Sequence, residues 1–471
     1  MTDVSRRGVL QSILTALVAL LTVVALLLPM GEFPLWNGED PGHRNQYELM
    51  AEAILDGRIT FDYGDEDSLA SLENPYDPEA RKNAGVYYHW DHAYYEGEYY
   101  MYFGIVPVFL VFLPYRVLTG ESLTTFRGTA TFAALAVIGI FVLFDLLRRR
   151  FFPSLPHGIY LCLSVAFSAM SIWYASVEPA LYCTAITAAI MLMIWSICFF
   201  VRAVWVETRE NRQIALAAVG ALFGALAFGC RPPIALANLL VIPALAVFLR
   251  ARKFTWRLLG KLCLAALPYL AVGVALMLYN YVRFDDPFEF GQAYQLTVAD
   301  QSNYSVTLDG EMLLRILRGI GEQFFDANGT TDAFPYLRTG GVLIHFPILY
   351  LSLGLADPRA FRAMKEKKLS LLLSGLLVTV LVITALDVMW SPYLLERYRM
   401  DIYFLAGIGA YLAIGLWYEA ADKWLRRALV AVTAVLSVQT VASSFLLALY
   451  RVNVSSPHRV AEVAAFFGLG G

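Results

Sequence analysis

Charged residues are scarce in this chain. Only 16% of its 471 residues are Asp, Glu, Lys or Arg, whereas a soluble domain carries about 25%. Hydrophobic residues make up 58% of the sequence, and the mean hydropathy is +0.57. This composition is typical of a polytopic membrane protein. The formal net charge of −3 gives no strongly basic surface, so no nucleic-acid partner is expected.

The chain also has few cysteines, five in all. The cysteines form none of the spacings that are typical of a metal site or a disulfide framework. They lie in or beside apolar runs, where cysteine acts as a small apolar residue, at Cys162, Cys183, Cys198, Cys230 and Cys263. The sequence also lacks internal repeats of about 20–50 residues, which excludes a solenoid.

Long apolar runs dominate the sequence. A transmembrane helix needs about 18–25 apolar residues. Runs of roughly this length cover residues 9–30, 123–147, 159–176, 181–204, 214–228, 234–249, 258–281, 341–356, 369–389, 402–417 and 428–450. They predict an all-α bundle of about eleven transmembrane helices, forming a single membrane domain over residues 1–471.

A further apolar run, 103–118, is shorter and contains Pro107 and Pro114. If this run crossed the membrane, the basic clusters after it would lie outside, against the positive-inside rule. We therefore predict a re-entrant or surface helix at 103–118, with the N-terminus in the cytoplasm. Two large outer segments follow from this topology, 31–102 and 282–339.

Each outer segment contains a helix-period pattern. In the first segment, Tyr47, Met50 and Ile54 share one face of a helix that ends near Asp56. In the second, apolar residues recur every three or four positions over 308–325. This second helix is interpreted either as a lid that orders over a substrate or as a simple interfacial helix.

Acidic residues stand at two exits from the predicted spans. Glu39 and Asp40 follow the first span, where a carboxylate can act as a general base or help to bind a metal. The alternative is a solvated turn in which Asp40 caps the next helix. Glu178 is the only acid between Asp145 and Glu207, and a carboxylate at that depth needs a partner, a cation or a role.

Arginines stand at other predicted outer junctions. A guanidinium matches the oxygens of a phosphate and keeps its charge, so these side chains are candidates for binding a lipid-phosphate head group. They are Arg231, Arg283, Arg397 and Arg399. The alternative is that each anchors in the head-group layer or pairs with a loop acid.

The segment 87–100 is dense in aromatic and acidic residues. The spacing of His89, Asp91 and His92 is compatible with a divalent metal but matches no closed zinc signature. The favoured interpretation is a β-hairpin with Gly97 at its turn, whose tyrosines stack on the membrane or on a glycan.

This layout resembles the GT-C superfamily of integral-membrane glycosyltransferases. Glu39-Asp40 matches the first acidic motif of that group, and Glu178 matches the second by position. The segments YNYVRFDDPFEFG and GGVLIHFPILYL are similar to later parts of bacterial members. The first motif reads GED here, the second is a lone glutamate, and nothing matches the peptide-binding motif of oligosaccharyltransferases.

The resemblance implies transfer of a sugar from a polyprenyl-phosphate donor to a glycan, lipid or protein acceptor on the outer face. Asp40, or its neighbour Glu39, would deprotonate the acceptor hydroxyl, and the arginines would hold the departing phosphate. Glu178 would position the acceptor or, with Asp40, ligate a divalent cation such as Mg²⁺ or Mn²⁺.

Two alternatives stay open at this point. A lipid-linked glycan transporter or flippase predicts charges within the spans and inverted repeats, and neither is evident in the sequence. An O-antigen ligase or polymerase-like protein predicts a large late outer loop with arginines and a histidine. The segment 282–339 has the arginines but no histidine.

Overall fold

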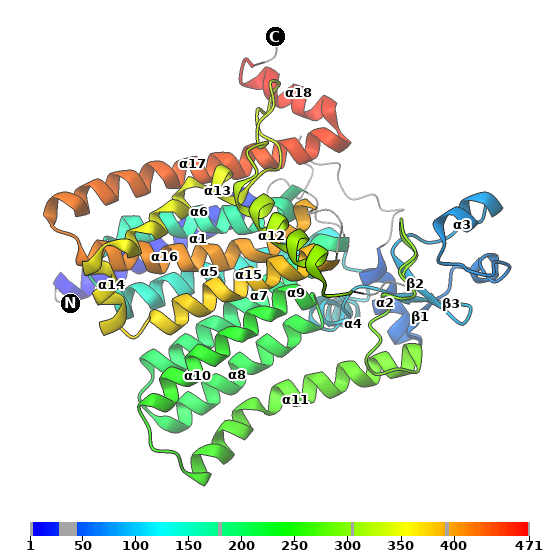
Figure 1. The fold of residues 1–471 in the computed structure, drawn as a ribbon, viewed down its shortest axis with the longest axis horizontal. Helices are drawn as coiled ribbons and strands as arrows, with labels where there is room; N and C mark the ends of the chain where they lie inside the picture. The colour runs from blue at the N-terminus through cyan, green and yellow to red at the C-terminus, as the bar shows by residue number, and fades with distance from the viewer. Residues whose placement is uncertain (1–2, 28–44, 178–180, 303–305, 391–394, 470–471) are drawn as a thin grey trace.

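The computed structural model describes residues 3–27, 45–177, 181–302, 306–390 and 395–469 (Figure 1). Ten helices within these ranges are long and apolar enough to cross a membrane. They are α1 Asp3–Leu27, α5 Thr125–Phe151, α6 His157–Val177, α7 Leu181–Val201, α8 Glu210–Phe228, α9 Pro232–Ala235 continued by α10 Val241–Arg250, α11 Trp256–Phe284, α15 Ser370–Trp390, α16 Glu396–Ala420 and α17 Lys423–Ser455. The predicted all-α polytopic membrane fold is confirmed.

Helices α6, α7 and α16 form the centre of the bundle. In each of them, 83% of the apolar window is buried, as expected for helices that are hydrophobic all round. Between α5 and α16, the rings of Phe144 and Tyr411 stack with their centroids 4.0 Å apart. Helices α1 and α11 are peripheral, with only 6% buried, and Figure 1 shows α11 running along one side of the bundle.

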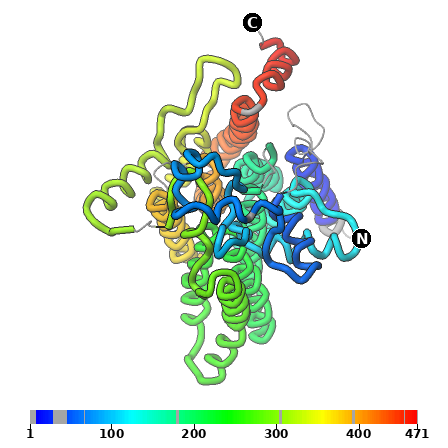
Figure 2. Tube along the Cα trace, turned by 90° about the vertical axis from the view of Figure 1, so that its right-hand side faces the viewer, coloured from blue at the N-terminus to red at the C-terminus, as the bar shows by residue number. Residues whose placement is uncertain are grey.

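The two ends of the bundle differ in charge. Arg148, Arg149 and Arg150 lie at the end of α5, on the side where the chain begins in Figure 1, and we name this the basic end. The opposite end, which we name the loop end, carries residues 45–102 and 285–340. Figure 2 looks onto the loop end and shows residues 45–102 lying across the ends of the helices.

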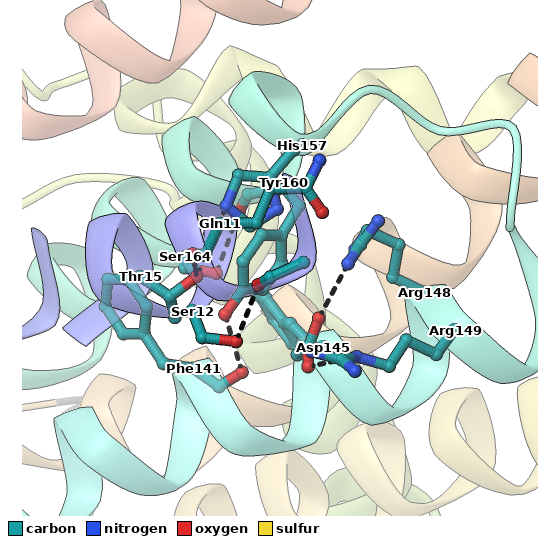
Figure 3. Close-up of polar contacts among 12 residues, drawn as sticks. Gln11, Ser12, Thr15, Phe141, Asp145, Arg148, Arg149, His157, Tyr160 and Ser164 are labelled. Atoms are coloured by element: carbon teal, nitrogen blue, oxygen red, sulfur yellow. Dashed lines mark hydrogen bonds and ion pairs between the residues drawn. The ribbon is translucent and has the colours of Figure 1, made fainter. Parts of the chain in front are cut away.

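At the basic end, a polar contact connects α1 to α6, close to the basic cluster of α5 (Figure 3). The Thr15 hydroxyl lies 3.3 Å from Nε2 of His157, which connects α1 to the first turn of α6. On α5, Asp145 accepts hydrogen bonds from Arg148 at 2.9 Å and from Arg149 at 2.6 Å. Asp145 therefore fixes the orientation of Arg148 and Arg149 on α5.

The predicted span 341–356 is not among the ten long helices. It forms the short α13, Val342–His345, followed by a 3₁₀ helix, Pro347–Ala356. Its start lies at the loop end, because Arg399 in the first turn of α16 donates a hydrogen bond to the carbonyl oxygen of Gly340.

Its other end lies at the basic end. Arg359, in α14 (Pro358–Glu366), forms an ion pair at 3.8 Å with Asp422, just beyond the end of α16. The segment therefore runs alongside the whole of α16, which is about 37 Å long. Together with the ten long helices, this crossing accounts for the predicted number of about eleven passes.

The run 103–118 forms a π-helical turn, Val108–Phe112, and then α4, Leu113–Thr119. Both of its ends lie at the loop end. Phe103 contacts the ring of Tyr182 at the start of α7, with a centroid distance of 5.2 Å. Arg116 in α4 lies 3.7 Å from the carboxylate of Glu52, which belongs to the first outer segment.

The first outer segment is built from short elements. They are α2 Gln46–Leu55, β1 Thr60–Phe61, a 3₁₀ turn Glu66–Ser68, α3 Pro78–Ala84, β2 His92–Tyr95 and β3 Glu98–Met101. The strands form one antiparallel sheet in the order β1-β3-β2. Glu96 and Gly97, with φ of 50° and 88°, close the β2–β3 hairpin, so the predicted hairpin with Gly97 at its turn is confirmed.

The second outer segment contains α12, Gly310–Phe325, close to the amphipathic helix predicted at 308–325. It packs on α15, where a Cβ added at Gly319 would approach Val388 to within 2.3 Å. A β-bridge between Ala93 and Gln295 joins the two outer segments. The chain ends in α18, Pro457–Phe466.

Helix α2 is fixed to the beginning of α5. The buried carboxylate of Glu48 accepts hydrogen bonds from the backbone N–H and from the hydroxyl of Thr125, the latter at 2.7 Å. Glu52, one turn later, accepts a hydrogen bond at 2.7 Å from Ser122. An acid at a helix N-terminus satisfies free N–H groups and complements the helix dipole. These contacts hold α2 across the loop end.

Replacing Glu48 with Ala should destabilise the protein by about 1–2 kcal/mol, because the N-terminus of α5 loses a buried acceptor. Thermal unfolding of the purified protein in nanodiscs measures this loss. Glu79→Ala, which removes an exposed acid from the first turn of α3, is the matched control and should leave the midpoint unchanged. Equal midpoints for the two variants would contradict this role of Glu48.

Candidate functional site

Three of the predicted site residues, Glu39, Asp40 and Glu178, lie outside the described residues. The described chain nearest to them converges at one place. Gln46 and Tyr47 begin α2, which follows the first acidic pair, and Tyr182 lies in the first turn of α7, which follows Glu178. All three of these described side chains lie close to the cluster of charged groups defined next.

Charged and tyrosine side chains from several distant segments meet at the loop end. We name this group the acid–arginine cluster. Its members are linked to one another by hydrogen bonds, ring contacts or close electrostatic interactions, and they are Asp91, Tyr102, Tyr182, Arg231, Asp387, Arg397, Tyr398 and Asp401. Two of the four predicted arginines, Arg231 and Arg397, therefore share one site.

Asp91 is the acid that the first outer segment contributes. Its side chain is 4% exposed, and its φ of 56° lies in the left-handed region, which aspartate tolerates better than most residues. Its carboxylate accepts hydrogen bonds from the Tyr182 hydroxyl and from the Gln295 amide, the latter at 2.7 Å. Asp91 thus connects the first outer segment to α7 and to the second outer segment.

The environment of Asp91 perturbs its titration. Burial raises the pKa of the Asp91 carboxyl above its ordinary value, because the charged form loses hydration. The hydrogen bond from Tyr182 and the positive charge of Arg397 oppose this rise and lower the pKa. Asp91 is therefore a buried acid held close to a guanidinium group.

Arg397 lies between aromatic rings. Its guanidinium carbon is 4.3 Å from the ring centroid of Tyr182 and 5.7 Å from that of Tyr398. No carboxylate among the described residues forms an ion pair with it. A guanidinium held by ring faces keeps its N–H groups available for an anion.

Arg231 is fixed by a buried carboxylate. Its Nε lies 2.7 Å and 2.9 Å from the two oxygens of Asp401, whose side chain is 0% exposed. The ring of Tyr398 lies 5.5 Å from the guanidinium carbon. Among the described residues, the buried Nη2 of Arg231 has no hydrogen-bond partner. Asp401 therefore holds one edge of Arg231 and leaves Nη2 available.

A second buried acid, Asp387 of α15, interacts electrostatically with both Asp401 and Arg231. Its Oδ2 atom has no partner in the described part of the chain. Ionisable groups within a membrane bundle are costly and commonly mark a functional pathway. Asp387 lies in the last turn of α15, at the loop end rather than in the middle of a span.

Helix α2 closes the cluster from the side of the first acidic motif. Gln46 donates hydrogen bonds to the backbone oxygen of Asp91 at 2.9 Å and approaches Nδ1 of His92 at 3.2 Å. The hydroxyl of Tyr47 is buried close enough to Arg231 for the guanidinium charge to act on its pKa, which burial raises well above the ordinary value. The segment that follows Asp40 thus contacts the cluster at two points.

The other two predicted arginines are placed apart from the cluster. Arg283 donates hydrogen bonds at 2.7 Å to the Met101 backbone oxygen and to the side chain of Asn280. Arg399 donates to the backbone oxygen of Gly340. Both side chains are buried, and these hydrogen bonds go to backbone and amide oxygens rather than to the loop acids of the alternative interpretation.

In the structure, His89 and His92 contact other protein side chains. His89 lies 3.2 Å from the carboxylate of Asp65, whereas Nε2 of His92 lies 2.8 Å from the Tyr63 hydroxyl. Burial lowers the pKa of His92 to about 4, so this ring is neutral at physiological pH. Within the described ranges, no group of three or more metal-binding side chains was found.

Sequence reasoning missed several members of the cluster. Asp387 and Asp401 carried a usable signal, since each is an acid at the end of a predicted apolar run. Asp91 was considered only as a metal ligand, because its histidine neighbours dominated the pattern. Tyr182 gave no signal, since a tyrosine at the end of a span is also expected in an interfacial belt.

No family model and no curated protein matches the chain. Among solved structures, it is similar to ArnT from Cupriavidus metallidurans bound to undecaprenyl phosphate, with 15% identity and a TM-score of 0.49, covering 96% of this chain and 79% of that chain. It is also similar to the archaeal oligosaccharyltransferase AglB from Archaeoglobus fulgidus, in complex with an inhibitory peptide and a dolichol-phosphate, with 13% identity and a TM-score of 0.47 over 94% of this chain and 56% of that chain.

At TM-scores this low, neither likeness carries a functional argument.

Breaking the Arg231–Asp401 pair should be strongly destabilising. Arg231→Met or Asp401→Leu alone leaves one uncompensated buried charge, which costs about 3–5 kcal/mol. The double variant should lose less stability than either single variant, because neither charge remains. Thermal unfolding of all four proteins in nanodiscs gives the coupling. If the stability loss of the double variant equals the sum of the two single losses, the direct pairing is contradicted.

Proposed function

We propose that this protein is a membrane glycosyltransferase of the GT-C type, which moves a sugar from a polyprenyl-phosphate-linked donor to an acceptor on the outer face. One observation carries the proposal: Arg231 and Arg397 share a partly buried cluster at the loop end of a multi-span bundle. The segments that carry Glu39, Asp40 and Glu178 adjoin this cluster along the chain.

The two arginines are suited to a phosphate that gains charge. When the bond between the sugar carbon and the phosphate oxygen breaks, the electron pair stays on the phosphate. A phosphodiester monoanion thereby becomes a monoester with additional negative charge. Arg231 offers its unpartnered Nη2 and Arg397 its ring-held guanidinium, and fixed donors of this kind stabilise developing charge without reorganisation.

A carboxylate completes the reaction. Asp40, or its neighbour Glu39, accepts the proton of the acceptor hydroxyl as the oxygen forms a bond to the sugar carbon. Attack from the side opposite to the leaving phosphate inverts the anomeric centre. Glu178 positions the acceptor or ligates a cation. Asp91 is a positioning residue, because it holds the Tyr182 ring against which Arg397 lies.

A divalent cation is part of this proposal. The described part holds three carboxylates, Asp91, Asp387 and Asp401, against the guanidinium groups of Arg231 and Arg397. A phosphate added to this set requires further positive charge or a proton. Asp40 and Glu178 are the candidate ligands for Mg²⁺ or Mn²⁺, which would supply that charge near the phosphate.

We further propose that the loop end faces the outside and that the N-terminus is cytoplasmic. The basic end carries the triplet Arg148, Arg149 and Arg150, and also α14 with Arg359 and Lys365. The positive-inside rule assigns such clusters to the cytoplasm. The protein then binds lipid-linked sugars at the loop end, on the outer face.

Mass spectrometry of lipid-linked sugars and envelope glycans tests the proposal in cells that lack the protein. A polyprenyl-phosphate sugar should accumulate and one glycan should lose a residue. The wild-type protein should restore that residue, whereas Asp40→Asn should not, because the amide cannot accept the proton. Arg397→Gln should lower transfer about a hundredfold. Arg318→Gln, on the exposed face of α12, is the control for loss of an arginine.

Full restoration by Asp40→Asn and Arg397→Gln would make these side chains structural. Unchanged lipid-linked sugars together with a glycan lost from the outer face alone would favour a transporter. Transfer of whole oligosaccharides rather than single residues would favour a ligase or polymerase.

A further inference from the structure

We infer that Tyr88 and Trp90 form a carbohydrate-binding subsite, which holds an acceptor glycan next to the acid–arginine cluster. This inference rests on the proposed function only in calling the bound glycan an acceptor. Binding of a sugar chain can be measured without any transfer. Tyr87, Tyr88 and Trp90 lie in the connection between α3 and β2, and we name these three side chains the aromatic ridge.

The aromatic ridge is open to solvent. Tyr87 is 66% exposed and Trp90 is 46% exposed, whereas Tyr88 between them is partly buried. Figure 1 shows α3 and the strands projecting beyond the ends of the bundle helices, away from the zone that the apolar spans occupy. Exposed aromatic groups at such a position lack the lipid environment that explains them on a spanning helix, and they are typical of a binding surface.

Trp90 directly precedes Asp91, a member of the acid–arginine cluster. Its side chain lies close enough to the neighbouring Asp91 carboxyl to lower the pKa of that group, and it also approaches the Tyr182 hydroxyl. Trp90 therefore adjoins the acid–arginine cluster, while nearly half of its surface remains exposed. A ligand stacked on this ring would lie directly beside the cluster.

The ring of Tyr88 is held by a cation–π contact with a buried arginine. The guanidinium carbon of Arg81 lies 4.4 Å from its ring centroid. Arg81 is itself 1% exposed and donates hydrogen bonds to the backbone oxygens of Pro75 at 2.7 Å and Thr297 at 2.6 Å. The rings of Tyr88 and Trp90 lie 6.3 Å apart with an interplanar angle of 38°. The ring of Tyr88 is already held by Arg81 before a ligand binds, which lowers the entropic cost of binding.

The chemistry of this surface fits a sugar chain. A sugar ring has an apolar C–H face and a hydroxyl rim, which match a ring face flanked by polar groups. An anionic lipid head group fits less well, because Asp65, Asp67 and Asp91 lie nearby on the same segment. Two adjacent ring faces of different tilt suit successive residues of an oligosaccharide.

Fluorescence anisotropy of the full-length protein in nanodiscs tests the inference. The probes are end-labelled linear hexasaccharides of mannose, glucose, galactose and arabinose, together with a labelled Ser/Thr-rich peptide and a labelled short-chain phosphatidylglycerol. At least one hexasaccharide should bind the wild-type protein. Trp90→Ala should weaken that binding about tenfold or more, and Trp90→Tyr should weaken it less.

Two further variants keep the result interpretable. Tyr88→Ala removes the second ring without touching the acid–arginine cluster, and it should also weaken binding about tenfold. Phe288→Ala removes an exposed aromatic side chain from the second outer segment and should leave affinity unchanged. Thermal unfolding confirms that each variant is folded. If Trp90→Ala does not fold, the Tyr88→Ala result decides.

The inference is overturned if no hexasaccharide binds, if the ridge variants bind as well as the wild type, or if the peptide or the lipid alone depends on the ridge. The assay contains no donor, so its outcome is separate from the transfer reaction. Ridge-dependent sugar binding without any transfer would leave this inference standing and remove the proposed function. Transfer without ridge-dependent binding would support the proposed function and overturn this inference.

Discussion

The buried ion pair between Arg231 and Asp401 is the constraint on which the loop end depends. Its two residues lie far apart in the sequence, one before α9 and the other in the second turn of α16, and the Asp401 side chain is 0% exposed. A guanidinium placed in an apolar bundle is tolerable only with a carboxylate partner in direct contact. The pair therefore fixes how these segments meet, and it leaves Nη2 of Arg231 available to a ligand.

Around this pair, the cluster is completed by side chains from both outer segments and from α7. Asp91 contributes from the first outer segment, Tyr182 from α7 and Gln295 from the second outer segment. Tyr398 lies against Arg231, and Arg397 lies against Tyr182. The site forms only when the bundle and both outer segments are packed together. A packing defect in any of them would therefore disturb the same cluster.

Much of the fold could be predicted from the sequence, because apolar length and basic clusters are local signals. The span 341–356 was predicted from composition, but its 3₁₀ geometry depends on packing along α16. The site could be predicted only in part. Arg231 and Arg397 meet in one cluster, whereas Arg283 and Arg399 donate to nearby backbone oxygens, and sequence position does not separate these cases. Asp91 was hidden because its role depends on Tyr182 and Gln295, which are distant in the sequence.

The most direct test of the central claim is an electron cryomicroscopy structure of the full-length protein in nanodiscs with a polyprenyl phosphate. The phosphate should lie within about 3 Å of Nη2 of Arg231 and of the Arg397 guanidinium, with the Arg231–Asp401 pair intact. A phosphate bound elsewhere on the loop end, with both arginines in contact only with protein groups, would contradict the claim that these two residues hold the leaving group.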